Sequence, residues 1–276
     1  MAQETQYTAN TGLVKISTAN SNLDGTGTLG TVITGASNGT LIKQVIIKGT
    51  DTGATANAEG MVRLFVDTGG SVKLLTEVHV PPSGQAQTVQ TFEAVLPLNF
   101  KLSSGYILKA STQNADGFNV IAEGLDYAYY GGSVRPESTN YTANTGVSSI
   151  TANNTALDGS GTVATLVTAG ASGSGWLGLA ISSISIKAYA DIATAGMVRL
   201  FIQNTSTGAA NTFLFREIDL PIVDATGTSQ SFHHAISFPD FLQIKAGYKI
   251  VGALQIAISG GSLATVVDGM DWKYPA

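Results

Sequence analysis

The sequence predicts an all-β protein made of two similar antiparallel β-sandwich domains. Three observations lead to this fold class: the chain repeats itself once, its apolar residues alternate with a period of two, and turn signals separate the alternating runs. Glycine accounts for 32 of the 276 residues and charged residues for 12%, against a usual charged fraction of about 25%. We therefore expect short strands joined by tight turns along the whole chain.

The repeat is a tandem duplication. Residues 7–12 (Tyr-Thr-Ala-Asn-Thr-Gly) recur letter for letter as residues 141–146, and residues 60–65 (Gly-Met-Val-Arg-Leu-Phe) recur as residues 196–201. Shorter matches follow in the same order to the end of the chain, and the insertions between them fall in stretches rich in Gly, Ser, Thr and Asn. Loops tolerate such insertions whereas strands do not, so the two copies should share one fold.

A linker separates the copies. Residues 131–140 combine glycine, proline and small polar residues, a composition typical of linkers and turns. We place the first domain at residues 1–135 and the second at residues 136–276. The copies should keep the same strand order and differ mainly in three loops, residues 168–180, 204–212 and 257–266.

Each copy contains about eight predicted strands. Val62, Leu64 and Val66 share one face of a strand, and the second copy repeats this phase, which identifies a core face. Eight strands in about 130 residues fit a sandwich of the jelly-roll type. In the first copy the strand-like runs are about residues 11–18, 28–34, 40–49, 60–67, 72–80, 88–98, 106–112 and 117–128.

Two duplicated charge pairs occupy the opposite, outward phase of these strands. Arg63 and Glu77 have their midpoint at a glycine, as do Arg199 and Glu217. Residues equidistant from the centre of an antiparallel hairpin lie opposite one another, so we expect each Arg to pair with its Glu on the outer face. The alternative is that all four are unrelated, solvated charges.

No catalytic site, cofactor site or metal site is predicted. The chain has no cysteine, which excludes disulfides, thiolate chemistry and cysteine-based metal sites. The run Gly-Thr-Gly-Thr-Leu-Gly at 25–30 matches a dinucleotide-binding fingerprint, but a strand candidate follows it where a helix is required. His233 and His234 are neighbours on a strand and point to opposite faces, which disfavours a shared metal ion.

Duplicated acidic residues suggest turns more strongly than calcium sites. Asp24 and Asp158 sit in Leu-Asp-Gly segments, and Asp126 and Asp271 sit in Gly-Leu-Asp and Gly-Met-Asp segments. The full oxygen-rich spacing of a calcium-binding loop is absent. Asp-Gly commonly forms a turn, which is the interpretation that we favour.

Aromatic residues end both copies. Tyr127 and Tyr129 fall on one face of the last strand of the first copy, and Trp272 and Tyr274 do so in the second. Such a pair can be an interface between domains or subunits, the last layer of a core, or a platform on which a sugar ring stacks. The sequence leaves these three interpretations open.

Charge and hydropathy limit the partners. The net charge of -5 gives no basic stripe for nucleic acid, and no apolar run is long enough to span a membrane. The start of the chain lacks the features of a signal peptide. We therefore expect neither a nucleic-acid nor a membrane partner, and a soluble protein made in the cytoplasm.

The repeated Gly-Met-Val-Arg-Leu-Phe segment, the outward Glu before a Pro and the Gly-Tyr that opens a late strand together resemble a module of tailed-phage virion proteins. This resemblance implies a non-enzymatic β-sandwich building block, a decoration or cement protein on the capsid surface. Its partners would be the major capsid protein and further copies of itself, with a homotrimer as the expected oligomer. Two alternatives are a double jelly-roll capsid subunit and a carbohydrate-binding adhesin or tail component.

Overall fold

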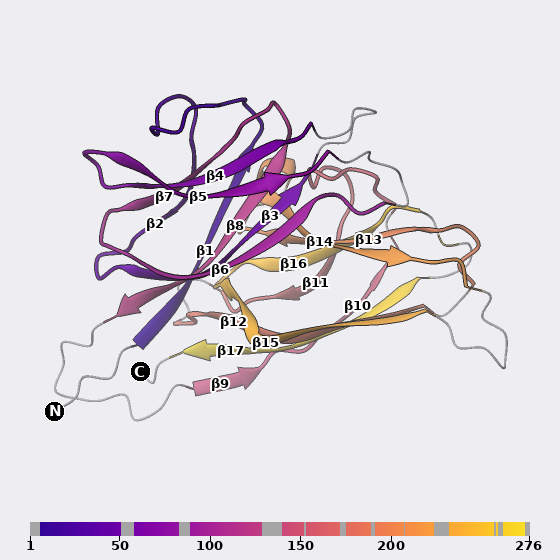
Figure 1. Cartoon of the computed structure of the whole chain (residues 1–276). Coiled ribbons are helices and arrows are strands. Elements are labelled where there is room, and N and C mark those ends of the chain that lie inside the picture. The colour runs from indigo at the N-terminus through magenta and orange to yellow at the C-terminus, as the bar shows by residue number, and fades with distance from the viewer. Residues whose placement is uncertain are drawn as a thin grey trace. The chain divides into compact units, whose positions relative to one another are not determined.

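The protein folds as two compact β units (Figure 1). The first unit comprises residues 1–85 and 91–137, and the second comprises residues 86–90 and 138–276. The computed structural model describes residues 6–50, 58–82, 89–128, 140–151, 153–171, 175–188, 191–206, 208–223, 232–256, 258 and 262–273.

The first unit is an eight-stranded jelly roll. Its strands are β1 (Gln6–Ile16), β2 (Gly30–Thr34), β3 (Thr40–Gly49), β4 (Gly60–Asp67), β5 (Val72–Val80), β6 (Glu93–Leu102), β7 (Ile107–Thr112) and β8 (Phe118–Ala128). They form two four-stranded antiparallel sheets with the orders β1-β8-β3-β6 and β2-β7-β4-β5. Strands 1 and 8, 2 and 7, 3 and 6, and 4 and 5 are therefore paired, as in one long hairpin rolled into a sandwich.

The second unit has the same strand order. Its strands are β9 (Asn140–Ala143), β10 (Gly146–Ile150), β11 (Ala164–Thr168), β12 (Gly178–Ala188), β13 (Gly196–Gln203), β14 (Thr212–Leu220), β15 (His233–Lys245), β16 (Lys249–Leu254) and β17 (Leu263–Lys273). The sheets are β10-β17-β12-β15, with β9 also on β17, and β11-β16-β13-β14. β9 and β10 together replace β1, because the strand is interrupted after Ala143. The prediction of two all-β jelly-roll domains is confirmed.

The two units also share their irregularities. Both contain three β-bulges at matching places. In the first unit they lie where β2 pairs with β7, where β3 pairs with β6 and β8, and where β4 pairs with β5. In the second unit they lie where β11 pairs with β16, where β12 pairs with β15 and β17, and where β13 pairs with β14. The register shifts lie between Thr31 and Ile33, Ile42 and Gln44, and Leu64 and Phe65, and between Thr165 and Val167, Ile181 and Ser183, and Leu200 and Phe201. A bulge re-aims every side chain beyond it, so the duplicated residues keep the same faces.

The core of each unit lies between its two sheets. Val62 and Leu64 of β4 are fully buried, as are Val45 and Ile47 of β3. The equivalent residues of the second unit, on β12 and β13, are also fully buried: Ile184, Ile186, Val198 and Leu200. The period-two pattern therefore identified the core face correctly in both copies.

Differences between the units concentrate in the connections. Three connections are longer in the second unit: residues 169–177 against 35–39, residues 204–211 against 68–71, and residues 255–262 against 113–117. A short 3-10 turn, Ala209–Asn211, lies in the second of these. The predicted loop ranges were slightly too long, because β12 already begins at Gly178 and β17 at Leu263.

Candidate functional site

The most conspicuous polar cluster of the first unit surrounds Arg63 on β4. Arg63 lies directly opposite Glu77 of β5, and its Nε donates to Glu77 Oε1 over 2.7 Å. Its Nη1 donates to the backbone carbonyl of Asn20 over 3.1 Å. The Arg63 side chain is 7% exposed and that of Glu77 is 37% exposed. The guanidinium is thus buried with partners for two of its donors.

The second unit repeats this cluster around Arg199 on β13. Arg199 lies opposite Glu217 of β14, and the Nε to Oε1 distance is 3.0 Å. Its Nη1 donates to the carbonyl of Thr155 over 2.8 Å and makes a longer contact of 3.4 Å with that of Asn154. Both charged side chains are buried here, Arg199 at 7% and Glu217 at 1% exposure.

An asparagine organises the loop that each arginine holds. Asn20 Nδ2 donates to the carbonyls of Thr26 and Thr28, each over 2.9 Å, and Asn20 Oδ1 accepts from the N–H of Asn22. Asn154 likewise donates to the carbonyls of Ser160 and Thr162 and accepts from the N–H of Ala156. We call the duplicated set the loop clamp: Asn20, Arg63 and Glu77 in the first unit, and Asn154, Arg199 and Glu217 in the second.

The loop clamp explains why outward-facing arginines are buried. Both arginines point away from the sandwich core, yet the connection between the first two strands of the jelly roll reaches over them and supplies the accepting carbonyls. A charge withdrawn from water needs partners for its hydrogen-bonding groups. The clamp provides them and at the same time fixes the path of the connection.

Glycines and aspartates shape the clamped connection. Gly25 and Gly27 have φ of 83° and 82°, a region that favours glycine, and a Cβ at Gly27 would lie 2.7 Å from Asn20 Oδ1. Asp24 Oδ1 accepts from the hydroxyl and N–H of Thr26, and these hydrogen bonds, the hydroxyl first, lower the pKa of Asp24. This is turn geometry. Strand β2 follows it, so the helix that a dinucleotide site needs is absent at this position.

The second duplicated acid of each unit, Asp126 or Asp271, is not in an Asp-Gly turn but within the last strand of its unit. Asp126 Oδ1 on β8 accepts from Asn10 Nδ2 over 2.9 Å and from Thr40 Oγ1 over 2.5 Å. Asp271 on β17 accepts from Asn144 Nδ2 over 2.7 Å and from the N–H of Gly170 over 3.0 Å. Each aspartate therefore ties its last strand to neighbouring segments of its own unit.

Burial raises the pKa of Asp271 above its ordinary value, and the hydrogen bonds from Gly170 and Asn144 oppose this rise only in part. The residue is 7% exposed. Desolvation disfavours the charged form of a carboxyl. The burial of Asp271 therefore opposes its ionisation.

The terminal aromatics differ between the units. Tyr127 lies opposite Tyr7, and the two rings are 5.4 Å apart at an angle of 47°. Trp272 lies opposite Tyr141, but Trp272 is 6% exposed and Tyr141 is 63% exposed. In the second unit the aromatic thus belongs to the buried layer. The predicted partners Tyr129 and Tyr274 lie outside the described residues.

The three histidines contact three different groups. His233 Nε2 lies 3.1 Å from Ser185 Oγ, His234 stacks on Phe232, and His79 Nε2 lies 3.1 Å from Glu59. Within the described residues, no group of three or more His, Cys, Asp or Glu side chains is arranged to hold a metal ion. The same residues include no helix with the length and apolar character needed to cross a membrane.

Sequence reasoning found the charges of the loop clamp but missed its asparagines. Asn20 and Asn154 occupy the same offset of 134 positions as the Leu-Asp-Gly motifs that follow them, so the duplication already contained the signal. A second pair was also missed: Lys43 Nζ lies 3.2 Å from Glu123 Oε1. In the second unit the equivalent bulged residue, Ser182, donates to Asp268.

Comparison with known proteins gives no family assignment. No protein-family model matches the chain, and no curated protein matches it. Among solved structures, it is similar to a chain described as "The Triple Jelly Roll Fold and Turret Assembly in an Archaeal Virus", with a TM-score of 0.29 and 11% identity over 99% of this chain and 60% of that one. The protein thus spans less than two thirds of that viral chain.

Two further structures show similarly low values. A recombinant N-glycanase F has a TM-score of 0.25 and 10% identity, over 95% of this chain and 96% of that one. A tandem CBM22-1-CBM22-2 domain of Paenibacillus barcinonensis Xyn10C has a TM-score of 0.19 and 12% identity, over 98% and 92% of the two chains.

Proposed function

We propose that this protein is a non-enzymatic structural protein of a virus particle, a decoration or cement protein that binds and stabilises a phage head. One observation carries the proposal: two duplicated charge pairs, Arg63 with Glu77 and Arg199 with Glu217, bind one another and the protein's own backbone. These two pairs serve the architecture, as is typical of a building block that acts through its surfaces.

The sequence resemblance supports a place of action in a virus particle. The Gly-Met-Val-Arg-Leu-Phe segment that resembles tailed-phage virion proteins forms β4 and β13, the strands that carry Arg63 and Arg199. A protein that binds only the assembled shell adds its binding free energy to that state and raises the resistance of the shell to heat. Capsid binding would therefore suffice for function, with further copies of the chain and the major capsid protein as partners.

Undecorated capsids test this proposal directly. We expect the purified protein to co-sediment with them at saturable stoichiometry and to raise their melting temperature. Absence of binding, or binding without any change in melting temperature, would contradict the cement function. Assembly of particles by this chain alone would instead identify a capsid subunit.

The aromatic pair Tyr7 and Tyr127 favours a second candidate, carbohydrate binding by an adhesin or tail component. The rings lie 5.4 Å apart and both residues are partly exposed, and aromatic faces of this kind can pack on an apolar ligand surface. A glycan array tests it: specific binding that is lost in Tyr127→Ala would favour this function over head decoration.

A further inference from the structure

The outer face of the sheet β10-β17-β12-β15 in the second unit is open and has an unusual composition. Its middle row, one residue from each strand in register, contains only small or β-branched side chains. Val147 is 76% exposed and Val266 is 43% exposed. The row consists of Val147, Val266, Ser185 and Ala235.

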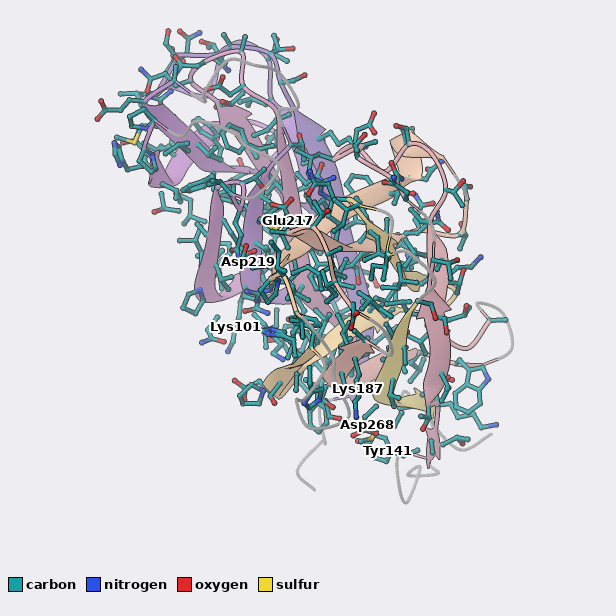
Figure 2. The ribbon with its side chains drawn as sticks, turned by 90° about the vertical axis from the view of Figure 1, so that its right-hand side faces the viewer. Lys101, Tyr141, Lys187, Glu217, Asp219 and Asp268 are labelled. Carbon is teal, nitrogen blue, oxygen red and sulfur yellow. The ribbon has the colours of Figure 1, made fainter. Side chains whose placement is uncertain are left out.

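Opposite charges flank this middle row. Two residues further along β12, the exposed Lys187 lies opposite His233. Two residues in the other direction along the strands, the exposed Asp268 of β17 lies opposite Ser183. Both residues are labelled in Figure 2. Their rows are four residues apart along β12, which corresponds to about 13 Å along the strand direction. No ion pair joins them in the described part of the chain.

In the first unit the charged residues at the same positions form ion pairs. There, Lys48 occupies the place of Lys187, and its Nζ lies 3.4 Å from Glu93 on the neighbouring strand. Glu123 occupies the place of Asp268, and the bulged Lys43 lies 3.2 Å from it. Both charges thus have a partner of opposite sign within their own sheet.

In the second unit those partners of opposite sign are replaced. His233 stands where Glu93 stands in the first unit, and Ser182 stands where Lys43 stands and donates to Asp268. One end of the outer face is left with a cationic side chain and the other end with an anionic one.

We propose that this outer face binds the same face of a second copy of the chain, across a two-fold axis that runs along the middle row. Such an axis turns one end of the face onto the other, so Lys187 of each copy lies over the Asp268 row of its partner. The middle rows pack against each other, and their small side chains let two sheets approach to the usual spacing of about 10 Å. The contact is isologous, as two-fold symmetry requires.

The composition favours a second copy over an unrelated partner because the face is complementary to itself. Three rows on four strands cover about 400 Å² per copy, or about 800 Å² in the pair, which is below the usual 1,200 to 2,000 Å² of a stable complex. The dimer should therefore be weak in solution, with a Kd of about 0.1 to 1 mM. Neighbouring copies held on a larger assembly would form it readily.

Sedimentation equilibrium of the full chain, from about 10 μM to 1 mM, should show a monomer–dimer equilibrium in this range. Asp268→Lys and Lys187→Asp each place like charges across the two-fold axis and should weaken the dimer at least about tenfold. The double variant Lys187→Asp with Asp268→Lys restores opposite charges and should restore the dimer.

Lys73→Asp is the matched control, because Lys73 is an exposed residue of β5 outside this face and the change of charge is the same. A chain that stays monomeric at the highest concentration would overturn the proposal. So would single reversals that act like the control, or a double variant that remains as weak as the single ones. Capsid binding by any of these variants is a separate measurement, so failure of the dimer and failure of head decoration are distinguishable.

Discussion

The connection between the first two strands of the jelly roll is held by similar polar contacts in the two units, yet its leucine is exposed in one unit and buried in the other. In the first unit this connection comprises residues 17–29, and Leu23 is 54% exposed. In the second it comprises residues 151–163, and the equivalent Leu157 is 3% exposed. The polar contacts around Asn20 and Asn154 are nearly the same, so they do not decide where the leucine goes.

The sheet beneath the connection decides it. Leu157 packs into a small apolar cluster with Phe201, Leu214, Val251 and Ala253. At the places of Val251 and Ala253, the first unit has Lys109 and Ser111. Lys109 forms an ion pair with Asp67 over 2.7 Å, so the first unit is polar at two of the four places that surround Leu157 in the second. The comparison separates the two contributions: the polar clamp sets the path of the loop, and apolar packing determines whether the loop joins a core.

Removing the arginine of the clamp should have the largest effect, and a larger one in the second unit. Arg199→Ala leaves Glu217 buried without its charge partner, which costs about 3 to 5 kcal/mol. Arg63→Ala should cost less, because the Glu77 side chain is 37% exposed and can be hydrated. Both tryptophans, Trp176 and Trp272, lie in the second unit, so tryptophan fluorescence during denaturant unfolding reports the stability of that unit.

Because tryptophan fluorescence reports only on the second unit, the two variants are compared by amide hydrogen exchange of the clamped loops, residues 17–29 and 151–163. Equal losses of protection for Arg63→Ala and Arg199→Ala would show that the difference in burial of the two glutamates has no energetic consequence.

Substitution of the loop leucine should have the next largest effect on stability, and only in the second unit. Leu157→Ala removes a buried side chain and should cost the second unit about 2 to 5 kcal/mol. Leu23→Ala alters an exposed side chain and should change stability by less than about 0.5 kcal/mol. The same unfolding and exchange measurements apply. A Leu23→Ala effect as large as that of Leu157→Ala would mean that the first loop also packs on an apolar surface.

Substitution of a glycine in the clamped loop should lower the stability of both units by a similar amount. Gly27 and Gly161 have φ of 82° and 77°, and a Cβ would lie 2.7 Å and 3.0 Å from the Oδ1 of the clamp asparagine. Alanine at either position should cost about 1 to 3 kcal/mol and increase hydrogen exchange across the clamped loop. Gly105→Ala is the control, because Gly105 has φ of 71° and open space around it. A control that loses as much as Gly27→Ala would assign the whole effect to the backbone angle.

The smallest expected effect is a pH dependence at Asp271. Because burial raises the pKa of Asp271 above the ordinary value of 3.8, the native state binds more protons than the unfolded state just above pH 3.8. The stabilising contribution of this group is therefore fully present below pH 3.8 and is lost as the pH rises through the folded pKa. Asp271→Asn should flatten this slope in tryptophan-detected unfolding. An unchanged slope would assign it to another group.

The sequence by itself determined the duplication, the strands and their faces. Two copies of one pattern show which positions alternate, and alternation with a period of two is a local property of a half-buried strand. The pairing of the clamp charges is also a local property, because each pair lies within one hairpin. Positions equidistant from a hairpin centre lie opposite one another, and in the structure Arg63 lies opposite Glu77 and Arg199 opposite Glu217.

Only the tertiary structure decided what covers these residues. The burial of Arg63 depends on the carbonyl of Asn20, 43 positions away in sequence, and the burial of Leu157 depends on strands β13, β14 and β16. Likewise, Asp126 accepts a hydrogen bond from Asn10, 116 positions away, and Asp271 accepts one from Asn144, 127 positions away. Such contacts join distant parts of the chain, and the energy of a buried polar group depends on those partners rather than on its neighbours in sequence.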